Sequence, residues 1–320
     1  MRITFLKLLK NLDEELRLLE DALEKKAKDF DHIVKIGRTH LMDAAPIRLG
    51  QVFLGYAFVI KKARRRLERA SERLLSVNIG ATAVGTGINT DLRYIKLVIK
   101  RLSKLTGFKL CMADNYVEIT QSMADFVQVS SALRELALEL TKILNDIRLM
   151  ASGPVGGLGE LILPAVQPGS SIMPGKVNPV IAEAMNMVCY QVLGNDFTVA
   201  LAAQAGQLEL NVMMPVIAHN IIQSIVILTN GLRMMRERMV VGILADEQRC
   251  KSVLERSPGI ALALSPFLGF EKTAEVVKRA VKEGKSIREV VLETGLMEAG
   301  LLDRILDPYS LTEMKAKKSE

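Results

Sequence analysis

Hydrophobic residues recur along most of the chain at alternating spacings of three and four. The leucines of the first such stretch are Leu9, Leu12, Leu16, Leu19 and Leu23. Charged and polar residues separate them, which places one apolar stripe along a helix. The same pattern returns in residues 129–150 and 217–235, whereas the strict alternation that predicts strands is essentially absent. The chain is therefore predicted to be all-α, built around a bundle of long helices.

The most apolar part of the chain, residues 199–228, is predicted to be one long helix packed among other helices. The polar residues that interrupt it are Gln204, Gln207, Glu209, Asn211, His219, Asn220 and Gln223. A helix in contact with lipid would not carry so many polar groups. The first residues of the chain also meet charges within a turn or two, unlike a secretory signal peptide. We therefore expect a cytoplasmic protein with no membrane partner.

Glycine and proline interrupt the helical pattern at three places, in residues 37–46, 78–89 and 152–179. The third break holds five of the ten prolines, and an irregular stretch of that length inside a compact domain is often functional. After residue 243 the predicted helices become shorter and more charged. The sequence therefore predicts a helical-bundle domain in residues 1–243 and a small C-terminal helical domain in residues 244–320.

The composition fits a folded globular protein with a large apolar core. Of the 320 residues, 49% are hydrophobic and 25% are charged, which excludes a disordered tail or a collagen-like fibre. Three scattered cysteines have no metal-ligand spacing and predict reduced thiols. The formal net charge of +7 includes a basic run from Lys61 to Arg73. We interpret this run as a solvated helix face, because neither a nucleic-acid motif nor an aromatic stacking set accompanies it. No nucleic-acid partner is expected.

The richest candidate chemistry lies in the third break, in the sequence GSSIMPGKVNP at residues 169–179. It offers the hydroxyls of Ser170 and Ser171, the cation of Lys176 and the amide of Asn178. The segment that follows is predicted to be helical, and a helix N-terminus suits an anionic ligand because of its unpaired N–H groups and its dipole. The alternative is an ordinary interhelical loop with a solvated lysine. The combination of groups favours the functional interpretation.

Histidines are rare in this chain, so each one is weighed separately. Thr39 and His40 lie in the first break, where an irregular segment could aim their side chains at a site. His32 lies among charged residues and is predicted to be on the surface. His219 lies in the apolar region and is predicted to bond a neighbour in the core.

The second break contains the sequence TAVGTGIN at residues 82–89. Its glycines would permit close approach of the backbone to a ligand, and Thr86 and Asn89 offer hydrogen-bonding groups. The segment lacks the acidic partner and the following helix of a dinucleotide-binding fingerprint, so that interpretation is rejected.

Together the three breaks resemble the fumarase/aspartase superfamily of lyases. GSSIMPGKVNP resembles the signature loop of the branch that contains class II fumarases and aspartate ammonia-lyases. The segments GRTHLMDAAPIRLGQ and TAVGTGIN resemble two further regions of the superfamily, in the same order. The resemblance covers essentially the whole chain. Two other segments, EITQS from Glu118 and AGQLELNVM from Ala205, are more similar to aspartase than to fumarase.

The resemblance implies a lyase that reversibly eliminates ammonia from L-aspartate to give fumarate. The alternatives are a class II fumarase, which converts malate to fumarate and water, and a truncated, catalytically silent helical scaffold. The substrate would be a small dicarboxylate, and neither a metal nor an organic cofactor is implied. Members of the superfamily assemble as homotetramers in which each site draws residues from three chains. They also carry a further N-terminal domain; the sequence predicts that this domain is absent here, and a separately encoded N-terminal piece would then be a partner.

The resemblance also implies a role for each candidate residue. Ser170 would take the proton from the substrate Cβ, and Lys176 would stabilise the carboxylate. His40 would contact the other end of the substrate, with Glu183 as its charge partner. The remaining substrate-binding candidates are Thr39, Ser171, Asn178, Thr86 and Asn89.

Overall fold

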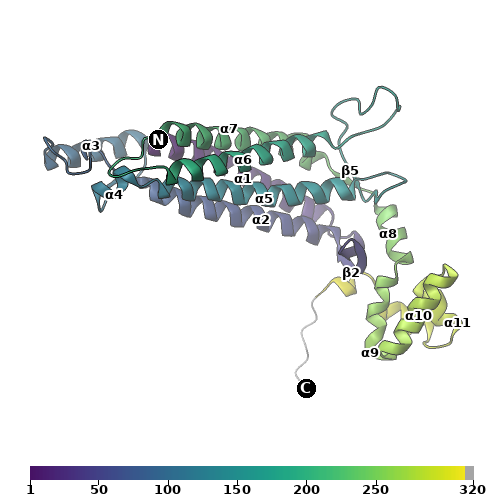
Figure 1. The fold of residues 1–320 in the computed structure, drawn as a ribbon. Coiled ribbons are helices and arrows are strands. Elements are labelled where there is room, and N and C mark those ends of the chain that lie inside the picture. Colours follow the sequence, from purple (N-terminus) through teal and green to yellow (C-terminus); the bar gives the residue numbers. More distant parts are fainter. Residues whose placement is uncertain (314–320) are drawn as a thin grey trace, which may run out of the picture. The chain divides into compact units, whose positions relative to one another are not determined.

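The computed structural model describes residues 1–313, and these are predominantly helical, which confirms the predicted fold class (Figure 1). The long helices are α1 (Arg2–Asp29), α2 (Leu49–Glu72), α5 (Ala124–Met150), α6 (Val180–Gln204) and α7 (Met214–Arg238). The shorter helices are α3 (Leu92–Thr106), α4 (Tyr116–Gln121), α8 (Glu247–Arg256), α9 (Ser265–Leu268), α10 (Phe270–Glu283), α11 (Ile287–Glu293) and α12 (Ala299–Ile305). Short 3-10 turns at Arg73–Leu75, Val240–Gly242, Pro258–Leu264 and Ser310–Thr312 complete the helical elements.

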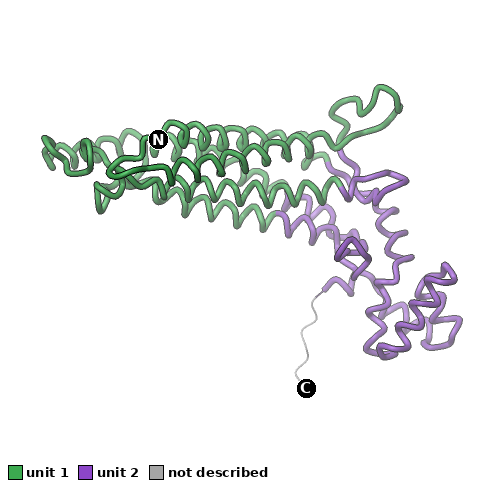
Figure 2. Tube along the Cα trace, in the orientation of Figure 1, with its two compact units in different colours: residues 1–22, 57–148, 164–242 green, residues 23–56, 149–163, 243–320 purple. Residues whose placement is uncertain are grey.

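The chain forms two compact units, each assembled from segments that are far apart in the sequence (Figure 2). Unit 1 contains residues 1–22, 57–148 and 164–242, and unit 2 contains residues 23–56, 149–163 and the chain from 243 onward. The sequence predicts two continuous domains, with the boundary after residue 243. The last segment of unit 2 begins at that point. The division into two continuous domains stays a prediction.

Unit 1 is a bundle held together by the apolar stripes of its long helices. The predicted leucine stripe of α1 is buried along its whole length. Near the start of that helix, the ring of Phe5 meets the ring of Phe126 edge-on, with centroids 5.6 Å apart. Helices α6 and α7 approach closely at Gly231, where an added Cβ would lie 2.6 Å from the sulfur of Met185. Close packing of this kind is what the periodic apolar pattern predicts.

The apolar region 199–228 is two helices joined by the loop of residues 205–213, so the prediction of one continuous helix was wrong. Helix α6 ends at Gln204 and α7 begins at Met214. The buried side chain of Asn211 makes the turn: its Nδ2 donates to the carbonyls of Ala202 and Ala203, each at 3.0 Å, and its Oδ1 accepts from the Met213 N–H at 2.8 Å. One polar residue of this region, Asn211, is therefore buried because its side chain hydrogen-bonds the backbone between the two helices. The apolar pattern alone does not reveal such a residue.

Residues 214–242 are, within the described chain, the one segment long and apolar enough to cross a membrane by length and composition. The apolar residues Ile217, Ile221, Ile225, Leu228 and Leu232 are buried inside the protein, and α7 packs against α6. A core helix of a bundle has the same length and composition. The five residues named above are therefore core residues of the bundle.

Unit 2 contains a β-hairpin at the place where the sequence predicted an irregular break. Strand β1 (Val34–Thr39) pairs antiparallel with β2 (Met42–Arg48), and the register is interrupted between Ile36 and Arg38. Two-residue strands form the remaining pairs in residues 1–313, β3 (Ser76–Val77) with β4 (Cys111–Met112) and β5 (Leu161–Ile162) with β6 (Leu244–Ala245). The hairpin was missed because a bulge and Pro46 disturb the alternation by which a strand is predicted.

The C-terminal part of unit 2 has an apolar cluster of its own. Its buried members include Leu264, Val276, Val290 and Leu302. Helix α11 begins with a capping box, in which the Ser286 hydroxyl accepts from the Glu289 N–H and the Glu289 carboxylate accepts from the Ser286 N–H. Such a cap satisfies two backbone donors that a helix start otherwise leaves unpaired.

The turn between α6 and α7 gives a direct test of its buried amide. Asn211→Ala would leave two carbonyls and one N–H without their partner, so we expect the free energy of unfolding to fall by about 2 kcal/mol. Chemical denaturation monitored by circular dichroism would measure it. Gln207→Ala, in the same turn but exposed, is the matched control and should change stability by less than about 0.5 kcal/mol. Equal effects of the two substitutions would contradict the assigned role of Asn211.

Candidate active site

The third break places four of the candidate residues in one loop of unit 1. Ser170, Ser171, Lys176 and Asn178 all lie between Pro164 and the start of α6, in the loop that projects beyond the helices in Figure 1. A cavity of about 430 Å³ opens within this loop. Its lining residues include Gln167, Ser170 and Lys176. The structure thus brings a hydroxyl and a cation to the same small cavity.

The Ser170 hydroxyl accepts hydrogen bonds from two backbone donors of its own loop. The N–H of Ile172 lies 3.1 Å from Ser170 Oγ and the N–H of Met173 lies 3.0 Å from it. A negatively charged oxygen accepts stronger hydrogen bonds than a neutral hydroxyl does, so these donors favour the alkoxide form. The role of Ser170 as a base stays a prediction.

The base of the loop is closed by Asn178 and by the absence of a side chain at Gly169. Asn178 Nδ2 donates to the carbonyl of Gly169 at 2.6 Å. An added Cβ at Gly169 would lie only 1.8 Å from the carbonyl oxygen of Lys176. Only glycine therefore fits where the two arms of the loop meet. In this structure the Asn178 amide shapes the loop, and its contact with a substrate carboxylate stays a prediction.

Glu183 lies in the first turn of α6, close to the end of α5. Its carboxylate accepts from Arg148 Nη2 at 3.4 Å. Thr39 and His40 belong to unit 2. The pairing of Glu183 with His40 therefore stays a prediction. Within one chain, the carboxylate of Glu183 contacts Arg148.

His40 occupies the turn of the β-hairpin. Thr39 pairs with Met42, and the two residues between them, His40 and Leu41, have φ angles of 55° and 62°. Positive φ at both central positions is the type I′ turn, which glycine and asparagine normally occupy. His40 and Leu41 are neither glycine nor asparagine, so their backbone is strained in this conformation, and strain of this kind clusters at functional sites. His40 is exposed, so the turn presents its imidazole to solvent rather than to the core.

A buried ion-pair network lies beneath this turn, and the hydrophobic pattern of the sequence does not predict it. Glu160 pairs with Arg38 at 2.7 Å and with Lys35 at 2.9 Å. Burial raises the pKa of the Cys250 thiol to about 12, and the negative charge of Glu160 adds to the effect. The sequence offered one signal, a glutamate within the otherwise apolar and glycine-rich run 156–163.

Thr86 and Asn89 lie at the opposite end of unit 1 from the Ser170 loop. Gly85 packs directly on the start of α4, where an added Cβ would lie 2.4 Å from Val117 Cα. Helix α4 precedes the N-terminus of α5, whereas Arg148 near the C-terminus of α5 contacts Glu183. The 27 residues of α5 separate the two ends by roughly 40 Å. One chain therefore does not bring Thr86 and Asn89 to Ser170 (Figure 1).

The other two histidines are both exposed. His32 is exposed and lies 3.2 Å from the carboxylate of Glu247, as expected of a surface residue. His219 is also exposed, so its predicted place in the core was wrong: it lies on the outer face of α7, one residue before the buried Asn220. Within residues 1–313, no group of three or more His, Cys, Asp or Glu side chains could hold a metal ion.

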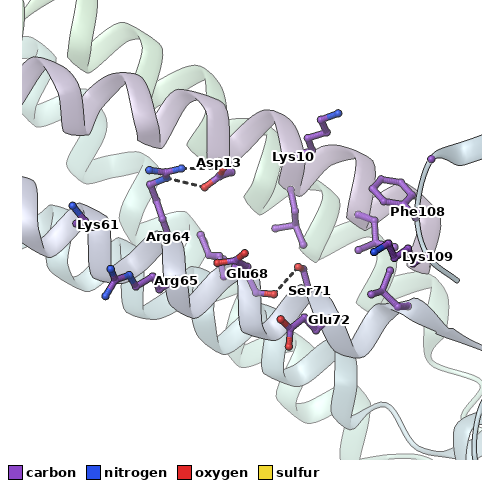
Figure 3. A pocket seen from close by; sticks show the side chains of 15 residues that line it. Lys10, Asp13, Lys61, Arg64, Arg65, Glu68, Ser71, Glu72, Phe108 and Lys109 are labelled. Carbon is purple, nitrogen blue, oxygen red and sulfur yellow. Dashed lines mark hydrogen bonds and ion pairs between the residues drawn. The ribbon is translucent and has the colours of Figure 1, made fainter. Parts of the chain in front are cut away.

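A larger cavity of about 590 Å³ lies in unit 1 between α1 and α2 (Figure 3). It is not the candidate active site, because none of the candidate site residues, all within the described chain, lines it. Arg64 on its wall pairs with Asp13 and Glu20, each at 2.8 Å. Arg66, in the same basic run, pairs with two glutamates of α5. These carboxylate partners support the interpretation of the run as an ordinary helix face.

Comparison with known proteins assigns the family. Residues 1–194 match the lyase family, and residues 260–313 match the family described as the fumarase C C-terminus. The chain belongs to the fumarase/aspartase superfamily. Aspartate ammonia-lyase from Bacillus subtilis (strain 168) is 46% identical over 98% of this chain and 66% of the relative. Aspartate ammonia-lyase from Helicobacter pylori (strain 26695) is 44% identical over 99% of this chain and 68% of the relative.

Solved structures of the superfamily share the fold. A fumarate lyase:delta crystallin from Brucella melitensis has a TM-score of 0.95 at 43% identity, covering 98% of this chain and 68% of that one. A class II fumarase from Schistosoma mansoni has a TM-score of 0.90 at 31% identity, covering 96% and 68%. The chain spans about two thirds of the length of the relatives that it matches. The higher identity to the aspartate ammonia-lyases confirms the branch that EITQS and AGQLELNVM indicated.

The closed base of the Ser170 loop can be tested by adding one methyl group. Gly169→Ala places a Cβ against the Lys176 carbonyl, so we expect the loop to open and trypsin to cleave after Lys176 several times faster. Gly156→Ala, where an added Cβ meets no atom within 4 Å, is the matched control. Limited proteolysis read by mass spectrometry measures the rate. Cleavage of both variants at the rate of the unsubstituted chain would contradict the packing.

Proposed function

We propose that this chain catalyses the reversible elimination of ammonia from L-aspartate to give fumarate. The observation that carries the proposal is the Ser170 hydroxyl, which accepts from two loop amides beside Lys176. The relatives at 43–47% identity that are named aspartate ammonia-lyases support the choice of substrate.

The chemistry explains why the loop must carry both donors and a cation. A proton on the carbon next to a carboxylate is very weakly acidic, because its removal places a second negative charge on that carboxylate. Ser170 as the alkoxide takes this Cβ proton, and Lys176 stabilises the doubly charged carboxylate that forms. The electron pair then makes the Cα–Cβ double bond as the C–N bond breaks and ammonia leaves. Stabilisation of the developing charge by groups already in place is the largest contribution that a protein makes to such a step.

We further propose that the site is completed in a homotetramer. Thr86 and Asn89 lie about one helix length from Ser170 within one chain, so a second copy would supply them to the Ser170 loop. Helix α6 carries an exposed apolar stripe suited to this assembly. Its members are Met187, Tyr190, Phe197 and Leu201, which share one face of the helix because their spacings of three, seven and four keep them aligned. A contiguous exposed apolar face of this kind marks an interface.

The assignment of the base is tested by Ser170→Ala. We expect kcat for fumarate formation from aspartate to fall by at least about 100-fold, as for loss of a general base. The melting temperature should not change, because Ser170 lies in a loop outside the core. Ultraviolet absorbance of fumarate measures the rate, and Ser252→Ala, an exposed serine of α8, is the control. Normal turnover by Ser170→Ala would refute the assignment. Fumarate from malate alone would instead support a class II fumarase, and none from either substrate would support the silent scaffold.

The tetramer is tested by charging the stripe of α6. Phe197→Glu places a carboxylate at the centre of the proposed interface, so we expect light scattering to report dimers or monomers where the unsubstituted chain gives the mass of four. Val281→Glu, on the exposed face of α10, removes a comparable exposed apolar group outside the stripe and should leave the mass unchanged. A monomeric unsubstituted chain would contradict the assembly.

A further inference from the structure

The buried network of unit 2 points to a positioning residue for the proposed reaction. We propose that Glu160, acting through Arg38, holds the Thr39–His40 turn in the orientation in which it meets the substrate. The inference rests on the proposed function, because it takes Thr39 and His40 as substrate contacts.

The burial of this network is far deeper than a surface ion pair requires. The side chains of Glu160, Lys35 and Arg38 are 1%, 6% and 14% exposed. Removing three charges from water is costly even when they are paired, and apolar residues of similar volume often stabilise a core equally well or better. The network is therefore poorly explained by stability alone. The contacts that the network makes with the hairpin explain its burial better.

Arg38 is the link between the network and the turn. It immediately precedes Thr39, and in the hairpin it lies opposite Asp43. Its guanidinium donates to Glu160 at 2.7 Å on one side, and its Nε lies 3.8 Å from the Asp43 carboxylate on the other. Asp43 in turn accepts from the Ser257 hydroxyl at 2.7 Å. One planar cation therefore ties both strands, directly below the turn, to a fixed point in the core.

Glu160 is that fixed point because its backbone is held on both sides. Its N–H donates to the Met150 carbonyl at 2.8 Å, and its own carbonyl accepts from the Asp246 N–H at 3.0 Å. The neighbouring backbone is held in addition by Arg249, which donates to the carbonyls of Gly157 and Leu158, each at 2.9 Å. The carboxylate consequently has a defined place from which to orient Arg38.

The turn needs such an anchor because its own residues do not hold it. His40 and Leu41 adopt left-handed backbone conformations that side chains disfavour. Both residues are exposed, so no core packing compensates for the strain. Without Arg38 fixed below it, the turn would relax toward less strained conformations, and His40 would lose its direction. Misplacement of a catalytic contact by 1 Å costs roughly 100-fold in rate.

Three substitutions separate positioning from stability. Glu160→Gln keeps the shape and removes the charge, and Arg38→Lys keeps the charge but removes the planar group that reaches both Glu160 and Asp43. Lys35→Met removes the other cation of the network and leaves the Arg38–Glu160 pair intact. We expect kcat per folded molecule to fall roughly 100-fold in the first two variants and less than about threefold in Lys35→Met, although all three lower the melting temperature. The double variant Arg38→Lys/Glu160→Gln should be no slower than either single variant, because both act on one link.

Hydrogen–deuterium exchange gives a second readout that does not depend on turnover. Exchange at the amides of residues 39–43 should rise in Glu160→Gln and Arg38→Lys and stay unchanged in Lys35→Met. Equal loss of kcat in all three variants at equal loss of stability would overturn the inference, as would unchanged exchange at the turn. If the unsubstituted chain forms no fumarate, the proposed function fails. The exchange experiment then still decides whether Glu160 orders the turn.

Discussion

The length of the bundle helices decides where chemistry can occur in this protein. Helices of 24 to 28 residues must bury an apolar face along their whole length, which leaves loops only at their ends. In unit 1 the Ser170 loop consequently lies at one end of α5, and the loop with Thr86 and Asn89 lies at the other. The packed helices between them keep the two loops apart within one copy, so a site that used both loops would need a second chain. This separation within one copy is the geometric reason for proposing the assembly.

Most of the fold could be predicted because burial repeats along a helix. The leucines of α1 fall at helical spacing and are all buried, and the same holds for Leu133, Leu136, Leu140 and Ile147 of α5. The two errors in secondary structure arose where short-range hydrogen bonding overrides that period. Asn211 stops one helix and starts the next with a single side chain, and the hairpin at residues 34–48 is too short and too irregular to show alternation. Such features depend on contacts that an apolar pattern does not record.

The candidate site could be predicted in part, and the division has a physical reason. Ser170, Lys176 and Asn178 lie within nine residues of one another, so the sequence itself shows that they share a loop. Glu160 and Arg38 are 122 residues apart, and only the fold brings them into contact. The strain at His40 and Leu41 was equally hidden, since neither residue type ordinarily predicts a type I′ turn. Candidate residues that are close together in the sequence can thus be predicted, whereas residues that reach them from distant parts of the chain cannot.

The charges of this protein fall into two populations with different consequences. Arg64 and Arg66 pair with carboxylates of neighbouring helices, and their own side chains remain 25% and 31% exposed, so water weakens these interactions in part. Glu160 and its two cations are withdrawn from water, so their mutual geometry is strongly determined and the loss of one member leaves a buried charge without a partner. The net charge of +7 does not distinguish these partly exposed pairs from the buried ones. In the proposed roles, the buried charges around Glu160 would orient the hairpin turn, and the loop amides at Ser170 would raise the share of its alkoxide form. Both proposed roles depend on polar groups that are fixed before the substrate arrives, which is what a weak base such as serine would require.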